Sequence, residues 1–166
     1  MSTSCVIGLQ EEIGILATYC LNDGYLDIAG VNLYNCYSDE ARLKELIKLG
    51  AIDSLGKTTE FITRAAVDAL DREKGLKDIL EDKCHPAELA SDGSRRTIIN
   101  TYDRRVVNFT EEEDFWNYQP VMNAEYWYLY KDKQWFCNCY IHDVGKRMVL
   151  PLIDAYNREF NTGNCE

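Results

Sequence analysis

The segment that most constrains the fold is a pair of aromatic and β-branched runs in the last third of the chain. One run is Glu125-Tyr-Trp-Tyr-Leu-Tyr130 and the other is Trp135-Phe-Cys-Asn-Cys-Tyr-Ile141, with residues 131–134 between them. Such residues favour extended backbone and pair well across neighbouring strands. The short polar connection joins them as a hairpin would, so the sequence predicts two antiparallel strands over 125–141.

A second hairpin is expected at the start of the chain. The runs Ser4-Cys-Val-Ile-Gly-Leu9 and Ile13-Gly-Ile-Leu-Ala-Thr-Tyr-Cys20 are separated by three polar residues, 10–12. Residues 96–109 are again β-branched and aromatic, with charges at 103–105 that interrupt them. They predict a further, broken strand between the two hairpins.

Helical spacing fills the gaps between these strands. The clearest pattern covers 39–49, where Leu43, Leu46 and Ile47 share a face and Gly50 follows as a left-handed C-cap. Ser38 is the expected N-cap. Further helices are predicted over 28–34, over 58–70, over 110–116 with a capping box at Thr110-Glu-Glu-Glu113, and after Gly145 as far as Phe160.

These elements together predict an α+β fold. We expect an antiparallel sheet built from two hairpins and a central strand, with helices packed on it. The chain has 166 residues and 46% of them are hydrophobic, enough for one core, so we expect a single domain over 1–166. Residues 71–93 are charged and lose periodicity, which predicts a flexible or inserted surface segment.

The charge balance restricts the partners. Acidic residues outnumber basic ones 28 to 18, which argues against a surface for duplex nucleic acid. The first residues lack the pattern of a secretory signal, and no apolar run approaches the roughly 20 residues that span a bilayer. We therefore expect a cytoplasmic protein with no membrane partner.

The cysteines suggest a reduced protein. There are seven, an odd number with irregular spacing, so we expect most to be small buried hydrophobes and not a disulfide framework. Cys137 and Cys139 would lie on one face of a strand, near His142, and could share a metal ion. Buried core cysteines explain the spacing better, so we predict no metal and no cofactor.

Other catalytic patterns are weak. His85 or His142 could serve Cys20 or Cys84 as a catalytic pair, but no nucleophile signature surrounds them, and we assign no catalytic residue. The chain has no Walker-type loop and no Gly-x-Gly-x-x-Gly.

A basic cluster stands out in this acidic chain. It comprises Arg95, Arg96, Arg104 and Arg105, and the segment between the two pairs carries Asn100 and Tyr102. A phosphorylated nucleotide needs cations for phosphate, an aromatic plane for the base and an amide or carboxylate for a polar edge. The alternative, left open, is that these arginines form ordinary surface ion pairs.

The aromatic hairpin also bears on assembly. Aromatic residues point to both of its faces, and one small layer cannot cover both. We expect part of this surface to meet a partner, a ligand or a second copy, and homo-oligomerisation is the simplest explanation.

Several blocks resemble a family of small proteins encoded by phages and prophages. They are Tyr19-Cys20-x-x-Asp23-Gly24-Tyr25, then Leu46-Ile47-x-Leu49-Gly50, Ile52-x-Ser54-Leu55-Gly56, Tyr102-Asp103-Arg104, and Glu125-Tyr126-x-Tyr128-Leu129 with Trp135. The chain departs from the family in having Leu21-Asn22 where His-Trp is usual, and Leu26 where Pro follows the tyrosine.

The architecture also resembles phage anti-Thoeris sponge proteins, which bind a cyclic ADP-ribose signal and hold it without cleaving it. This resemblance implies a non-catalytic homo-oligomer with pockets between protomers. For a small nucleotide ligand we predict a site formed by Asp23, Tyr25, Arg96, Asn100, Tyr102 and Arg104.

Three alternatives stay open. Asp23-Gly24 is also what a plain turn requires. The net charge of −10 would suit an acidic inhibitor that binds a host enzyme. A Cys/His-dependent enzyme is the third.

Overall fold

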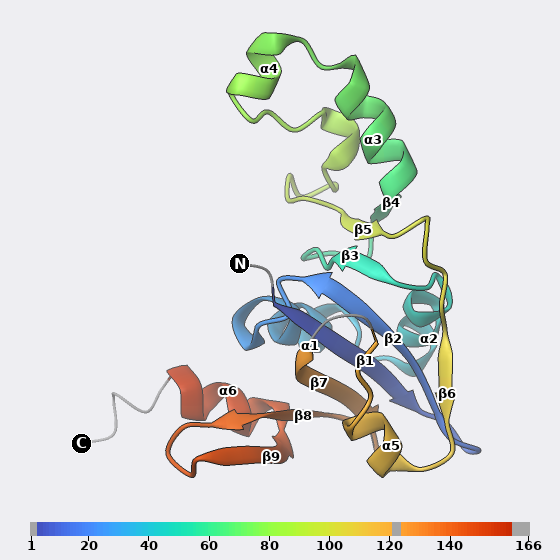
Figure 1. Ribbon diagram of the computed structural model, residues 1–166, viewed down its shortest axis with the longest axis vertical. Helices are drawn as coiled ribbons and strands as arrows, with labels where there is room; N and C mark the ends of the chain where they lie inside the picture. Colours follow the sequence, from blue (N-terminus) through green and yellow to red (C-terminus); the bar gives the residue numbers. More distant parts are fainter. Residues whose placement is uncertain (1–2, 121–123, 161–166) are drawn as a thin grey trace.

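The computed structural model describes residues 3–120 and 124–160, which form a mixed sheet of nine strands flanked by helices (Figure 1). The strand order is β4-β5-β3-β2-β1-β7-β8-β9, and β6 pairs with β2 beside this path. The strands are β1 (Ser4–Gln10), β2 (Ile15–Asn22), β3 (Ile52–Ser54), β4 (Phe61–Thr63), β5 (Thr97–Ile99), β6 (Val107–Phe109), β7 (Ala124–Lys131), β8 (Gln134–Ile141) and β9 (Lys146–Pro151).

The helices lie mostly between the strands. They are the π-helical turn η1 (Leu26–Gly30), α1 (Val31–Cys36), α2 (Glu40–Lys48), α3 (Arg64–Glu73), α4 (Leu76–Leu80), the 3₁₀ turn η2 (Pro86–Glu88), α5 (Glu112–Trp116) and α6 (Leu152–Phe160). The α+β character expected from the sequence is therefore confirmed.

Both predicted hairpins form. In the first, β1 and β2 run antiparallel, with Cys5 opposite Cys20. In the second, β7 and β8 run antiparallel, with Tyr130 opposite Trp135. Asp132 and Lys133 connect β7 to β8 with φ of 52° and 60°, the two positive values that a tight type I′ hairpin turn needs.

The sheet is not antiparallel throughout, which corrects the predicted arrangement. β1 pairs in parallel with β7, β2 with β3, and β4 with β5. Between β2 and β3 the chain passes through η1, α1 and α2, and such a crossover returns it to the sheet in its original direction. The hairpin patterns are local, whereas these parallel pairings join distant segments, so periodicity alone could not reveal them.

The most clearly predicted helix is confirmed as α2, with a different cap. Asp39 caps it, because its Oδ1 accepts from the Arg42 backbone N at 3.0 Å. Ser38 instead donates its hydroxyl to the Tyr34 carbonyl at 2.6 Å. Gly50 has φ of +94°, as expected for the residue after a helix.

Three other helices begin later than their patterns suggested. Residues 61–63 form β4 before α3 begins, and residues 146–151 form β9 before α6 begins. Pro151 thus ends a strand and is not inside the helix. The capping box predicted at Thr110 is absent, since Glu111 is the N-cap residue of α5 and makes no side-chain cap bond.

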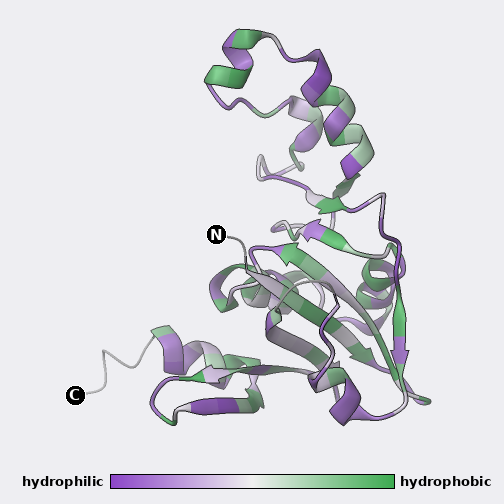
Figure 2. Cartoon of the chain, viewed as in Figure 1, coloured by the Kyte–Doolittle hydropathy of each residue, from purple (hydrophilic) through white to green (hydrophobic). Residues whose placement is uncertain are grey.

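Two apolar clusters cover the two faces of the sheet. The larger lies under α1, α2 and α6 and includes Tyr128, while the smaller gathers Trp127 and Leu129 around Phe115 of α5. Trp127 is 3% exposed and Tyr128 is 0% exposed. Both faces of β7 are therefore buried within one chain, because α5 supplies the second layer there. Tyr140 of β8 is 47% exposed, so the expectation that part of the aromatic hairpin meets a partner stays a prediction. Figure 2 shows hydrophobic colouring along β2 and β6 and also on turns of α3 and α4.

The cysteines are free where the structure describes them. Cys5, Cys20, Cys137 and Cys139 are buried, and Cys36 and Cys84 are half-buried. Cys165 lies outside the described residues. Among the helices of residues 3–120 and 124–160, none has the length and apolar character to cross a bilayer.

A lobe projects from the β4–β5 end of the sheet (Figure 1). We define the lobe as residues 64–90, which contain α3, α4 and η2. Val67 is the buried residue of α3, and α4 buries none of its residues. The lobe is therefore held by few apolar contacts, and it includes most of the 71–93 segment singled out in the sequence.

Candidate functional site

A polar cleft of about 490 Å³ lies where the lobe meets the sheet. The polar cleft is lined by Asn22, Asp23, Ser54, Arg64, Val67, Asp71, Lys74, Asp82, Lys83, Cys84, Glu88, Arg95 and Ile98. The hollow between α1 and α6, by contrast, is lined mainly by apolar side chains.

The floor of the cleft is formed by strand ends. Because β2 and β3 are parallel, their last residues, Asn22 and Ser54, lie opposite each other, and Ile98 of β5 pairs beside Ser54. In sheets with helical crossovers, ligands commonly bind beyond the carboxyl ends of parallel strands. Within the described residues the Ser54 hydroxyl has no hydrogen-bond partner, so it is available to a ligand.

One wall comes from a single face of α3. Arg64, Val67 and Asp71 follow each other at intervals of three or four residues, the spacing that brings side chains to one side of a helix. Lys74, the C-cap residue of α3, continues this wall. Residues 82–84, Glu88 and Arg95 form the rest of the lining.

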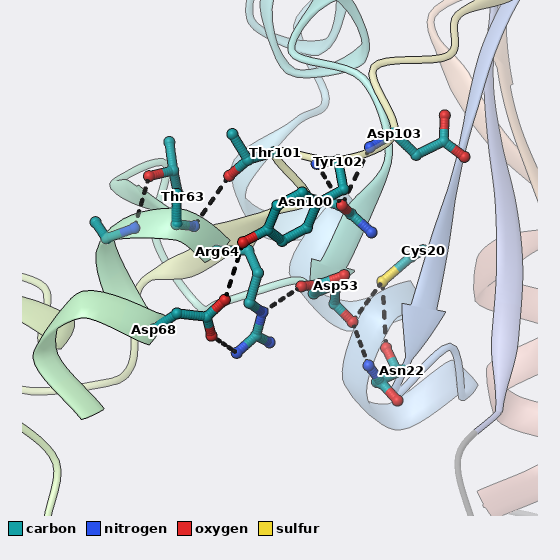
Figure 3. A network of polar contacts seen from close by, with 12 residues as sticks. Cys20, Asn22, Asp53, Thr63, Arg64, Asp68, Asn100, Thr101, Tyr102 and Asp103 are labelled. Carbon is teal, nitrogen blue, oxygen red and sulfur yellow. Dashed lines mark hydrogen bonds and ion pairs between the residues drawn. The ribbon is translucent and has the colours of Figure 1, made fainter. Parts of the chain in front are cut away.

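Arg64 is fixed between two carboxylates (Figure 3). Its Nε donates to Asp53 Oδ2 at 2.6 Å, and its Nη1 lies 3.9 Å from Asp68 Oδ1. Asp53 is 5% exposed and belongs to β3, so the ion pair joins the lobe to the body of the sheet. Tyr102 donates its hydroxyl to Asp68 Oδ2 at 3.3 Å and extends the network to the loop after β5.

The floor is tied into the same network. Asn22 donates its side-chain amide to the backbone carbonyl of Asp53 at 2.8 Å, and the Cys20 thiol donates to the backbone carbonyl of Asn22 at 3.2 Å. The first bond joins the end of β2 to β3, and the second lies within β2.

The amino end of α3 does not offer an anion site. The Ala65 backbone N donates to Thr101 Oγ1 at 3.0 Å, and the Ala66 backbone N donates to Thr63 Oγ1 at 3.2 Å. Two of the N–H groups that could receive a phosphate are thus already capped by hydroxyls. These two N–H groups are therefore not available to an anion.

The lining carries equal numbers of acidic and basic side chains, but only some of them form ion pairs. Lys74 pairs with Asp71 at 2.8 Å and Lys83 with Glu81 at 2.8 Å. The bond to Asp71 also raises the pKa of Lys74. Arg64 pairs with Asp53, so Arg95 is the one lining cation that has no ion pair within the described residues. It is the natural anchor for an anionic group.

The predicted turn reaches the cleft through Asp23. Asp23 is exposed, lines the cleft and has φ of 59°. The neighbouring residues have structural contacts: Gly24 N donates to the Thr3 carbonyl at 2.8 Å, and Tyr128 donates its hydroxyl to the Gly24 carbonyl at 2.8 Å. Tyr25 is half-buried and packs edge-on against Tyr126, with ring centroids 6.4 Å apart.

The other predicted residues lie outside the lining. Arg96 donates Nε to the Leu89 carbonyl at 2.9 Å and lies 3.7 Å from Glu60. Asn100 Oδ1 accepts from the Tyr102 and Asp103 backbone N at 2.8 and 3.2 Å, which closes a turn. Arg104 lies with its backbone against Gly50. Tyr102, 77% exposed, approaches the site through Asp68 and Arg64.

A second network fastens this loop to β2. Tyr19 donates its hydroxyl to Asp103, which lies 3.2 Å from Arg105. The Tyr19 hydrogen bond, with help from Arg105, lowers the pKa of the Asp103 carboxyl, and burial followed by the Asp103 contact raises the pKa of Tyr19. Arg105 therefore has a surface ion pair, as the alternative interpretation of the basic cluster holds.

Arg64 and Arg95 were missed by the sequence reasoning for different reasons. Neighbouring residues in extended backbone point to opposite sides, so either Arg95 or Arg96 could have faced the cleft, and the sequence does not say which. Arg64 carries no local signal, since its role depends on Asp53, which lies in another strand.

The cysteine and histidine candidates are separated from the cleft, apart from Cys84. Cys137 and Cys139 are buried on one face of β8, and burial is the main cause that raises the pKa of Cys137. His142 packs edge-on against Tyr140, and His85 Nδ1 accepts from the Ala87 backbone N at 3.0 Å. In the ranges 3–120 and 124–160, no three His, Cys, Asp or Glu side chains are grouped to hold a metal.

Comparison with known proteins adds no relative to this description. No protein-family model, no curated protein and no solved structure matches the chain.

Proposed function

We propose that this protein binds a small phosphorylated nucleotide in the polar cleft and holds it without cleaving it. The observation that carries the proposal is Arg95, the one cation in the lining of the cleft that has no ion pair among the described residues. An unpaired arginine offers a fork of N–H donors that suits a phosphate group.

The remaining lining fits the rest of a nucleotide. Ser54 and Asn22 present polar groups on the floor, and the carboxylates of Asp23 and Glu88 can accept hydrogen bonds from hydroxyl or amino groups. Tyr102 offers an exposed aromatic ring beside Arg64, although it does not line the cleft itself. The volume of about 490 Å³ lies within the usual range for small-molecule sites.

The biological setting follows from the family resemblance. We propose a phage-type protein of the bacterial cytoplasm that sequesters a cyclic nucleotide signal of host defence, with cyclic ADP-ribose as the first candidate. Homo-oligomerisation remains part of this proposal. It is supported by the resemblance and by the exposed Tyr140 of β8, while β7 is already covered on both faces within one chain.

Calorimetric titration tests the proposal directly. Purified protein is titrated with cyclic ADP-ribose isomers and with cyclic di- and trinucleotides. The bound ligand is then released by heat and identified by its mass. Saturable binding with intact ligand recovered is the expected result. Cleavage products would make the protein an enzyme, and the absence of heat with every nucleotide would overturn the proposal.

Two arginine substitutions locate the site. Arg95→Ala should weaken nucleotide binding at least tenfold, because a hydrogen bond to a charged group contributes about 1.5–3 kcal/mol. Arg72→Ala is the matched control, since Arg72 is exposed on the same lobe and does not line the cleft. The double variant Arg96→Ala/Arg104→Ala tests the site predicted from the sequence, and a loss confined to that variant would move the site away from the cleft.

A second candidate function is favoured by the net charge of −10. An acidic inhibitor would bind a basic surface on a host enzyme, and that binding would weaken steeply with salt and need no nucleotide. Binding that survives Arg95→Ala and disappears at high salt would favour this candidate.

A further inference from the structure

We infer that Arg64 couples ligand binding to the attachment of the lobe, with Asp53 as its positioning residue; this rests on the proposed function. Among the described residues, the Asp53–Arg64 contact is the one ion pair that joins the lobe to the body. The same guanidinium lines the polar cleft. One side chain therefore belongs both to the attachment of the lobe and to the binding surface.

The lobe depends on such polar contacts. Since α3 buries Val67 and α4 buries no residue, few apolar contacts oppose the opening of the lobe. The other attachments near α3 are the Ala65–Thr101 and Tyr102–Asp68 hydrogen bonds, and Tyr102 is largely exposed. Loss of the better-buried Asp53–Arg64 pair should loosen the α3 end of the lobe without unfolding the sheet, while the hydrogen bonds from Arg96 to the Glu88 and Leu89 carbonyls still hold its other end.

The geometry of Arg64 determines whether a bound ligand tightens or loosens the lobe, which is the sign of the coupling. Nε is taken by Asp53 and Nη1 lies near Asp68, whereas Nη2 has no partner within the described residues. An anion can therefore bind Nη2 without displacing Asp53. Bound ligand would join the floor to α3 through Arg64 and tighten the lobe, and by reciprocity an attached lobe would bind the ligand more strongly.

Hydrogen exchange without ligand tests the attachment. Asp53→Asn should speed the exchange of amides in residues 64–90 about tenfold, since it weakens a charged hydrogen bond, while β1 and β2 keep their rates. Arg64→Gln removes the same ion pair by changing its more exposed partner, and it should speed the same amides. It therefore tests the attachment even if Asp53→Asn folds poorly. Asp78→Asn, also in the lobe but in no ion pair among the described residues, is the control. Unchanged lobe exchange in Arg64→Gln would overturn the inference.

Inorganic pyrophosphate is the probe for the coupling itself. It should slow lobe exchange in the unmodified protein, and Asp53→Asn should weaken its binding several-fold. Tighter binding by Asp53→Asn would mean that Asp53 competes with the anion for Arg64, and this would overturn the proposed sign. If nucleotides bind while pyrophosphate leaves lobe exchange unchanged, the coupling fails and the proposed function stands. If no nucleotide binds, the proposed function fails on its own test.

Discussion

At the scale of single residues, neighbours in space decide what a charged side chain can do. Arg95 and Arg96 are adjacent and chemically identical, yet Arg96 holds the Leu89 carbonyl and faces Glu60, whereas Arg95 lines the polar cleft without an ion pair. A cation that is already paired gains less from a ligand, because it must give up one partner to take another. Affinity for an anion should therefore depend on Arg95 more than on Arg96.

Gly50 gives a prediction at the same scale. Its φ of +94° strains any other residue, and a Cβ there would lie 2.6 Å from the Cα of Arg104. Gly50→Ala should lower the free energy of unfolding by at least about 2 kcal/mol, measured by urea denaturation. Gly75→Ala is the control, since Gly75 has φ of −75° and no atom within 4 Å of the added Cβ; as the N-cap residue of α4 it should lower stability by no more than about 1 kcal/mol. Equal effects of the two substitutions would contradict this account of Gly50.

At the scale of elements, the β7–β8 hairpin combines stabilising strands with a strained turn. The strands bury aromatic residues on both faces, while Lys133 holds a φ of 60° that glycine adopts more readily. Lys133→Gly should raise the free energy of unfolding by about 1 kcal/mol, as read from the urea midpoint. Lys131→Gly, in the adjoining strand and paired with Glu112 at 2.7 Å, should lower it. If Lys133→Gly lowered the free energy of unfolding, the Lys133 side chain would not be a source of strain in the turn.

At the scale of the whole molecule, stability is expected to be uneven. The sheet buries two apolar clusters, whereas the lobe buries little and projects from the β4–β5 end. Brief trypsin treatment of the native protein should therefore cut first after Arg72, Lys74, Lys77 or Lys83, as judged by the masses of the first fragments. First cuts after Lys44 or Lys48 of α2 would show that the lobe is no weaker than the body. Flexibility of residues 71–93 stays a prediction until this measurement.

The sequence by itself determined the local elements. Runs of β-branched, apolar and aromatic residues joined by short polar connections predicted both hairpins, and apolar spacing with Gly50 predicted α2. Strand pairing across a short turn and helix formation both depend on residues close in the chain. Asp23 reached the cleft from such a local turn. The boundaries at β4 and β9 were wrong where a short strand precedes a helix and the two periodicities overlap.

Only the tertiary structure decided which distant segments meet. The parallel pairing of β2 with β3, the covering of the second face by α5 and the choice of Arg95 over Arg96 all depend on contacts between residues far apart in the chain. Asp53 and Arg64 belong to different elements, and neither sequence neighbourhood indicates the other. Helices and turns arise from short-range geometry, but a site assembled from strand ends and a lobe exists only after the chain has folded.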